Sequence, residues 1–233
     1  MTYLGQYINK ENKTMAANQT AGFGFRQAPT VGSTPATGGQ AEYKIKSGLG
    51  VGIFKNNPVS PQHTAGDDGY LQDAAAGTMD DGITGGAGWA TSTSNIQKLL
   101  GVFNGAFYID NSTSKPTYAN SVAASTTFAK DYNTGSNDGI GFVNDNPMQE
   151  YTTKCTAAAT QAQLLYTFNP QDGATAGTSE YGQSTVKLTN TGTATTAMFR
   201  IVRVANDPAN NDNSVVNSNV IVQMSPSACK SNS

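Results

Sequence analysis

The sequence predicts an all-β protein with one short helix, long polar loops and an extended N-terminal arm. Ten Tyr and nine Phe recur within short runs of β-branched residues, which is typical of strands. The 25 Gly, together with many Thr, Ser and Asn between these runs, are typical of turns. Only 13% of the 233 residues are charged, whereas disordered chains are rich in charge and poor in aromatic residues. A folded β protein therefore explains the composition better than disorder does.

The first strand is expected at residues 42–46, where apolar and charged side chains alternate. A second run, residues 51–54, ends at the turn signal Asn56-Asn57-Pro58. Residues 63–94 are mostly Gly, Ala, Asp, Thr and Ser. We interpret this stretch as a long insertion that holds at most a short hairpin, because structureless loops of this length are uncommon inside compact domains.

The strongest core segment is residues 99–109, and Gly105 at its centre predicts a bend or bulge. Residues 140–143 lead through a tight turn into a strand at 148–152. Residues 157–168 are the best helical candidate, because their apolar residues fit a helical stripe.

Three further strands are expected in the last third of the chain, at residues 184–188, 198–204 and 219–224. Phe103 and Ile201 lie in the most apolar runs and are expected in the core. We interpret the chain as an N-terminal arm (residues 1–20) followed by a single β-rich domain (residues 21–233). The pattern leaves barrel and sandwich both open.

Charge and hydropathy narrow the class of partner. The net charge is −2 and no basic cluster occurs, so binding to nucleic acid or to anionic lipid through charge is excluded. No apolar stretch approaches the roughly 18 residues of a membrane span. Residues 1–14 are polar and lack the apolar region of a secretory signal. We expect a soluble protein with no nucleic-acid or membrane partner.

The residues of common catalytic and metal sites are sparse, so we expect no enzyme activity, no metal and no cofactor. The single histidine, His63, lies in a polar loop without a nucleophile motif. Cys155 and Cys229 form no metal-binding pair, and the sequence leaves open whether they are bridged. The acidic pairs Asp67-Asp68 and Asp80-Asp81 lack the order of a calcium loop and are expected in turns.

Several short motifs resemble those of tailed-bacteriophage capsid decoration (cement) proteins, and they occur in the same order over residues 20–224. They are Ala21-Gly-Phe-Gly-Phe-Arg26, Tyr43-X-Ile45, Gly52-Ile-Phe54 with the turn 57–59, Gly101-Val-Phe103 with Gly105 and Tyr108, Asp145-Asn-Pro147, Phe199-Arg-Ile-Val-Arg203 and Val220-Ile-Val222. The chain departs from that family in the residues before Met15, in the long insertion, and in Gln27-Ala28, where the family has a basic residue.

This resemblance implies a non-enzymatic structural virion protein that binds the outside of a tailed-phage head and stabilises the shell. It also implies synthesis in the host cytoplasm, contact with the major capsid protein, and self-association, including trimers around local symmetry axes. An arm with aromatic anchors fits this role, because it can order on a neighbouring subunit. The expected contact residues are Tyr3, Leu4, Tyr7, Ile8, Phe23, Phe25 and Arg26. For Phe23 and Phe25, burial in the protein's own core is an equal alternative.

A second class of function is a head fibre or other virion appendage that binds host-surface glycans. Trp89 in its Gly-rich loop, with Tyr70 nearby in sequence, is the feature that suits stacking on sugars. A third class, an enzyme such as a depolymerase, has no supporting constellation of residues.

Overall fold

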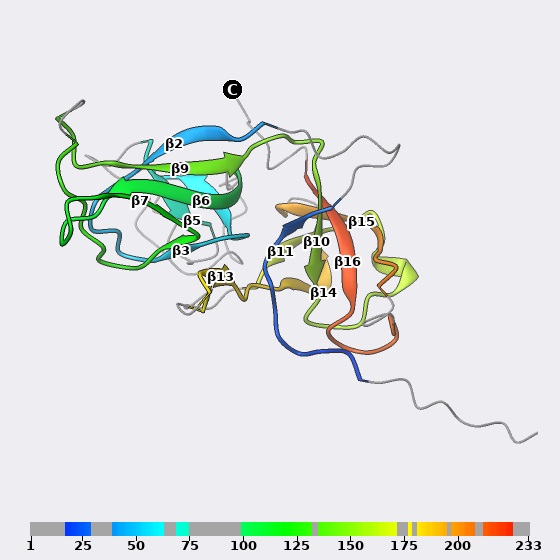
Figure 1. The fold of residues 1–233 in the computed structure, drawn as a ribbon. Helices are drawn as coiled ribbons and strands as arrows, with labels where there is room; N and C mark the ends of the chain where they lie inside the picture. The colour runs from blue at the N-terminus through cyan, green and yellow to red at the C-terminus, as the bar shows by residue number, and fades with distance from the viewer. Residues whose placement is uncertain are drawn as a thin grey trace, which may run out of the picture.

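The computed structural model describes residues 17–28, 39–62, 69–74, 99–131, 135–171, 177–178, 181–194, 197–207 and 212–225. Within these segments the chain forms sixteen strands and one short 3-10 turn, Gln161–Gln163 (Figure 1). The predicted all-β class is therefore confirmed.

Six antiparallel strands form one sheet, which we call the C-terminal sheet. Their spatial order is β1 (Arg26–Gln27), β10 (Glu150–Lys154), β16 (Asn219–Met224), β15 (Phe199–Val204), β11 (Thr167–Pro170) and β14 (Leu188–Ala194). Strand β1 thus brings the N-terminal part of the chain to the edge of a sheet otherwise built from its second half.

The second six-stranded sheet, which we call the central sheet, lies beside the first (Figure 1). Its order is β2 (Ala41–Ile45), β9 (Gly139–Asn144), β6 (Gly101–Ile109), β4 (Pro58–Pro61) and β5 (Leu71–Asp73), and β7 (Pro116–Ala119) also pairs with β6. Two short pairs accompany it, β3 (Ile53–Phe54) with β8 (Ser121–Val122) and β12 (Gly177–Thr178) with β13 (Gln183–Ser184). Neither large sheet closes on itself, so the architecture is sandwich-like rather than a barrel.

Each large sheet has its own buried apolar cluster, and β6 contributes to both. Val102 belongs to the cluster of the C-terminal sheet and Phe103 to that of the central sheet. Successive side chains on a strand point to opposite faces, so one strand can serve two cores. Phe103 and Ile201 are both completely buried, which confirms their expected core position.

The predicted irregularity at Gly105 is confirmed. The pairing of β6 with β9 shifts register between Phe103 and Gly105, which marks a bulge. Gly105 has a φ of +148°, a conformation that side-chain-bearing residues rarely adopt. The glycine therefore lets β6 bend while it pairs on both sides.

The predicted helix at residues 157–168 is wrong. Only the 3-10 turn forms there, and β11 already begins at Thr167. The buried Asn190 side chain explains the difference, because its Nδ2 donates to the carbonyl oxygens of Ala157 and Ala158 and its Oδ1 accepts from the N–H of Ala157. These tertiary hydrogen bonds occupy backbone groups at the start of the predicted helix.

Two predicted regions lie partly outside the described residues. Of the insertion at 63–94, residues 69–74 are described, and β5 within them pairs with β4, which lies before the insertion. The short hairpin expected inside the insertion stays a prediction. Of the arm at residues 1–20, only residues 17–20 are described.

Candidate functional site

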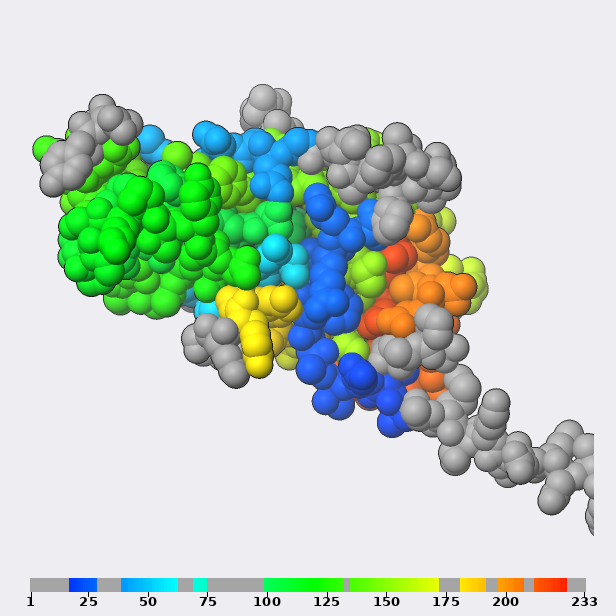
Figure 2. All heavy atoms as spheres, viewed as in Figure 1, coloured from blue at the N-terminus to red at the C-terminus, as the bar shows by residue number. Residues whose placement is uncertain are grey.

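Residues 17–28, which we call the strap, lie along the C-terminal sheet and end in β1 (Figure 2). At the start of the strap, Asn18 Nδ2 donates to the carbonyl oxygens of Asp212 (2.8 Å) and Val216 (3.1 Å). Asn18 is buried although it is polar. Its hydrogen bonds therefore fix the strap to the loop before β16.

Gly24 turns the strap sharply at its centre. Its φ is +71°, and a Cβ at this position would lie 2.5 Å from the carbonyl oxygen of Asn56. The N–H of Gly24 donates to Val186 and that of Phe25 to Asn56, so the strap is hydrogen-bonded on both sides of the turn. In a regular extended segment residues i and i+2 share a face. The positive φ of Gly24 breaks this rule for Phe23 and Phe25.

Phe25 lies in the core of this protein. Its side chain is 0% exposed, and its ring stacks on Phe199 at a centroid distance of 4.2 Å. Tyr151 meets the same Phe199 ring edge-on. The core alternative is thus the correct one for Phe25, and the expected contact of this side chain with a capsid or a neighbouring subunit is wrong.

Phe23 lies at the surface, half buried, with two cationic groups over its ring. Arg26 Cζ lies 4.5 Å from the ring centroid and Lys154 Nζ lies 5.8 Å from it. Arg26 pairs with Thr152 in the register of β1 and β10, so Arg26 and Lys154 project from the same face of the sheet. The sheet register thus brings together two cations that are 128 positions apart in the chain.

A cavity of about 250 Å³ opens beside this cluster. Its wall includes Phe23, Arg26, Lys154, Asp207 and Asn219. Lys154 is only 2% exposed, and its Nζ donates to the carbonyl oxygen of Gln19 at 2.6 Å. Asn219 Nδ2 donates to Asp207 Oδ2 at 2.7 Å. Among the described residues, the charged side chains of the wall are Arg26, Lys154 and Asp207, so it offers an electrostatic binding surface.

The titration of Lys154 reflects the charges and the burial around this cavity. Burial of the ammonium group lowers the pKa of Lys154, repulsion from Lys187 adds to the effect, and Asp207 opposes it. A group whose charged form is poorly solvated is stabilised by an anion placed next to it. The cavity is therefore suited to a negatively charged group.

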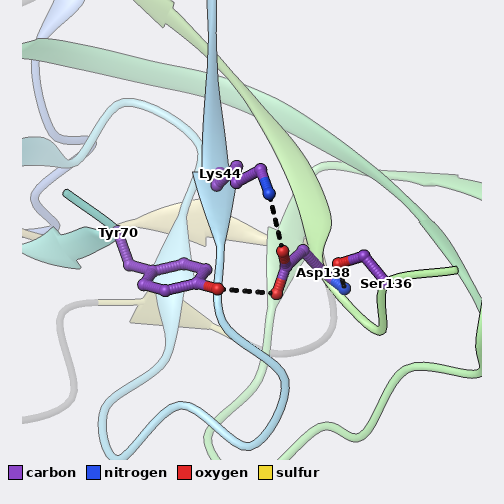
Figure 3. A network of polar contacts seen from close by, with 4 residues as sticks. All are labelled: Lys44, Tyr70, Ser136 and Asp138. Carbon is purple, nitrogen blue, oxygen red and sulfur yellow. Dashed lines mark hydrogen bonds and ion pairs between the residues drawn. The ribbon is translucent and has the colours of Figure 1, made fainter. Parts of the chain in front are cut away.

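A second polar cluster joins separate parts of the central sheet (Figure 3). Asp138 accepts hydrogen bonds from Lys44 Nζ and from the Tyr70 hydroxyl, both at 3.0 Å, and its N–H donates to Ser136 Oγ. Burial alone would raise the pKa of Asp138, but the hydrogen bonds from Ser136, Lys44 and Tyr70 outweigh it and hold that pKa below its usual value. This cluster links β2 to the segments before β5 and β9, which is a structural role.

The other residues singled out from the sequence divide into two groups. Tyr70 is described, and its hydroxyl donates a hydrogen bond to Asp138. The remaining ones lie outside the described residues, namely Tyr3, Leu4, Tyr7, Ile8, His63, Asp67, Asp68, Asp80, Asp81 and Trp89.

Cys155 is a free, buried thiol whose pKa burial raises to about 12, and Cys229 lies outside the described residues. Among the residues that the structure describes, no three His, Cys, Asp or Glu side chains gather as metal ligands. The same residues include no helix with the length and hydropathy of a membrane span.

Several large apolar side chains lie on the surface, and sequence reasoning missed them as a candidate contact set. The most exposed are Tyr118 (76%), Met148 (69%), Leu165 (68%), Tyr181 (66%) and Val216 (54%). Tyr118 lies in β7, where its ring packs on Phe107 of β6 at 4.8 Å. Period-2 patterning marks which residues share a face, but in an edge strand such as β7 it does not tell which face is covered.

Comparisons with known proteins give no family for this chain. No protein-family model matches it, and searches of curated proteins and of solved structures likewise return no match. The resemblance to decoration proteins therefore stays a prediction from the short motifs.

Proposed function

We propose that this chain is a structural virion protein that binds the outside of a tailed-phage head and stabilises the shell, without enzymatic activity. The observation that carries the proposal is the exposed pair Val215 and Val216 at the point where the strap begins. Val215 is 40% and Val216 54% exposed, and the carbonyl group of Val216 accepts the hydrogen bond from Asn18. These valines thus lie at Asn18, which follows the stretch with Tyr3, Leu4, Tyr7 and Ile8 in the sequence by ten positions, counted from Ile8.

An exposed aliphatic pair suits docking onto another protein, because its burial releases water from apolar surface. The low charge of the chain supports the same role, since interface centres are depleted in charged residues. The major capsid protein and neighbouring copies of this chain are the proposed partners.

The copy number of the protein in purified particles tests the proposal. Quantitative mass spectrometry of virions, calibrated against the major capsid protein, should find on the order of hundreds of copies, because cement proteins cover a shell that repeats its local axes many times. Tens of copies or fewer would indicate a fibre or portal-proximal protein instead. A matched control is the portal protein, quantified in the same sample.

A second candidate is a glycan-binding virion appendage, which the exposed ring of Tyr118 favours. This ring is 76% exposed and is supported from one side by Phe107. A supported, exposed aromatic ring is suited to stacking on a sugar. A glycan-array signal that disappears in Tyr118→Ala, and persists in the control Tyr181→Ala at another exposed tyrosine, would favour the appendage over the cement protein.

A further inference from the structure

We infer that the cavity beside Phe23 is a receptor for a carboxylate side chain, Glu or Asp, of the protein that this chain covers. We call it the Arg26 pocket, formed by Phe23, Arg26, Lys154, Asp207 and Asn219. The inference rests on the proposed function for the identity of the partner, whereas the recognition chemistry rests on the pocket alone.

The charge balance around the pocket carries the first step. Arg26 and Lys154 line it, and Lys187 lies close enough to affect the titration of Lys154. Asp207 is the one carboxylate among the described residues of the wall, and Asn219 already donates to it. The local charge is therefore positive on a chain whose net charge is −2. Such a local excess attracts a negative group of a partner.

The geometry of Arg26 carries the second step. Its guanidinium carbon lies 4.5 Å from the centroid of the Phe23 ring, while the residue remains exposed to solvent. The guanidinium forms no hydrogen bond or ion pair with another residue in the described part of the chain. A planar guanidinium presents parallel N–H donors that match the two oxygens of a carboxylate.

The size and wall of the cavity carry the third step. Its volume of about 250 Å³ lies below the range of roughly 300–1,000 Å³ that is usual for small-molecule sites. It is suited to one side chain inserted from a partner. The Phe23 ring offers an apolar wall for the methylene groups of a glutamate or aspartate, and the buried Lys154 ammonium lies at the same wall.

Shell binding by charge variants tests the inference. Arg26→Gln should weaken binding of the full chain to purified shells about tenfold or more, because it removes the bidentate donors. Arg26→Lys should restore part of the loss, since it keeps the charge without the planar fork. The matched control is Lys115→Gln, an exposed lysine in the turn between β6 and β7, which should change binding less than twofold. Equal binding by wild type and Arg26→Gln would overturn the inference.

A titration of the isolated chain separates this inference from the proposed function. Sodium glutarate, added at constant ionic strength to isotope-labelled protein, should give saturable NMR shifts of the Arg26 Nε–H signal and of the Phe23 backbone amide. Neutral glutaramide should give none, and Arg26→Gln should abolish the Phe23 shift. Absence of a saturable glutarate effect would refute the receptor. A clear glutarate site in a protein that does not bind shells would instead refute the proposed function and leave the receptor standing.

Discussion

Truncating the two phenylalanines of the strap separately should have very different effects on stability. Phe25 is completely buried and stacked on Phe199, so Phe25→Ala removes a whole aromatic ring from the core. Such a change costs about 3–5 kcal/mol, from lost transfer free energy and the cavity left behind. Phe23 is only half buried. Phe23→Ala removes this partial burial and the contacts of the ring with two cations, so it should lower the free energy of unfolding by about 1–2 kcal/mol.

Urea unfolding at constant temperature, followed by far-UV circular dichroism, measures this difference. The slope of the free energy of unfolding against urea concentration should be the same in both variants, so that their unfolding midpoints report differences in stability. For a chain of this length, a loss of about 3–5 kcal/mol lowers the melting temperature by roughly 6–20 °C. The two variants are controls for each other, because they share residue type and motif. Equal losses, or a larger loss for Phe23→Ala, would refute the assignment of Phe25 to the core and of Phe23 to the surface.

Three further predictions concern the arm, the buried thiol of Cys155 and the partly buried hydroxyl of Tyr43. Deleting residues 1–14 should leave the melting temperature within about two degrees of the wild type and weaken binding to shells. Raising the salt concentration should weaken shell binding by the full chain only mildly. Unchanged shell binding by the truncated chain would show that the arm is dispensable. Burial raises the pKa of Cys155 to about 12, so this thiol should not react with a thiol reagent at about pH 8 until denaturant is added. The Cys229→Ser variant, in which Cys155 is the remaining cysteine, measures this reaction. A fast reaction of the folded variant would contradict the burial of Cys155. Partial burial, together with the hydrogen bond to Asp145, raises the pKa of Tyr43 from 10.0 to about 12. The stability that the protonated Tyr43 hydroxyl contributes is therefore complete below pH 10 and is lost as the pH rises toward 12. The free energy of unfolding, measured between about pH 10 and 12, should fall less steeply in Tyr43→Phe than in the wild type. An identical fall in both proteins would show that Tyr43 does not contribute.

The sequence by itself determined the class of the fold, the positions of β2, β6, β9, β10, β15 and β16, and the bulge in β6. These features depend on local signals: alternation of apolar residues marks a strand, and a glycine within an apolar run marks a place where the chain bends. The strand expected at residues 184–188 is wrong, because residues 185–187 lie between β13 and β14. The core positions of Phe103 and Ile201 follow from the apolar runs in which they lie, and both are fully buried. Local patterning is sufficient here because an apolar strand is buried whatever its partners are.

Tertiary structure alone decided the features that depend on distant groups. The helix expected at residues 157–168 does not form, because Asn190 hydrogen-bonds the backbone of Ala157 and Ala158, and the sequence carries no sign of that contact. A barrel and a sandwich share the same alternation within each strand, so only the pairing of strands could decide between them.

The candidate site shows the same division. Phe23 and Phe25 are equivalent in the sequence, two positions apart in an apparently extended segment. The positive φ of Gly24, imposed by backbone contacts with Asn56 and Val186, sends one ring to the surface and the other into the core. Lys154 reaches Phe23 only because β1 pairs with β10 in one particular register. Residue type and spacing determine which side chains share a face locally, whereas a site assembled across strands depends on pairing between segments that are far apart in the chain.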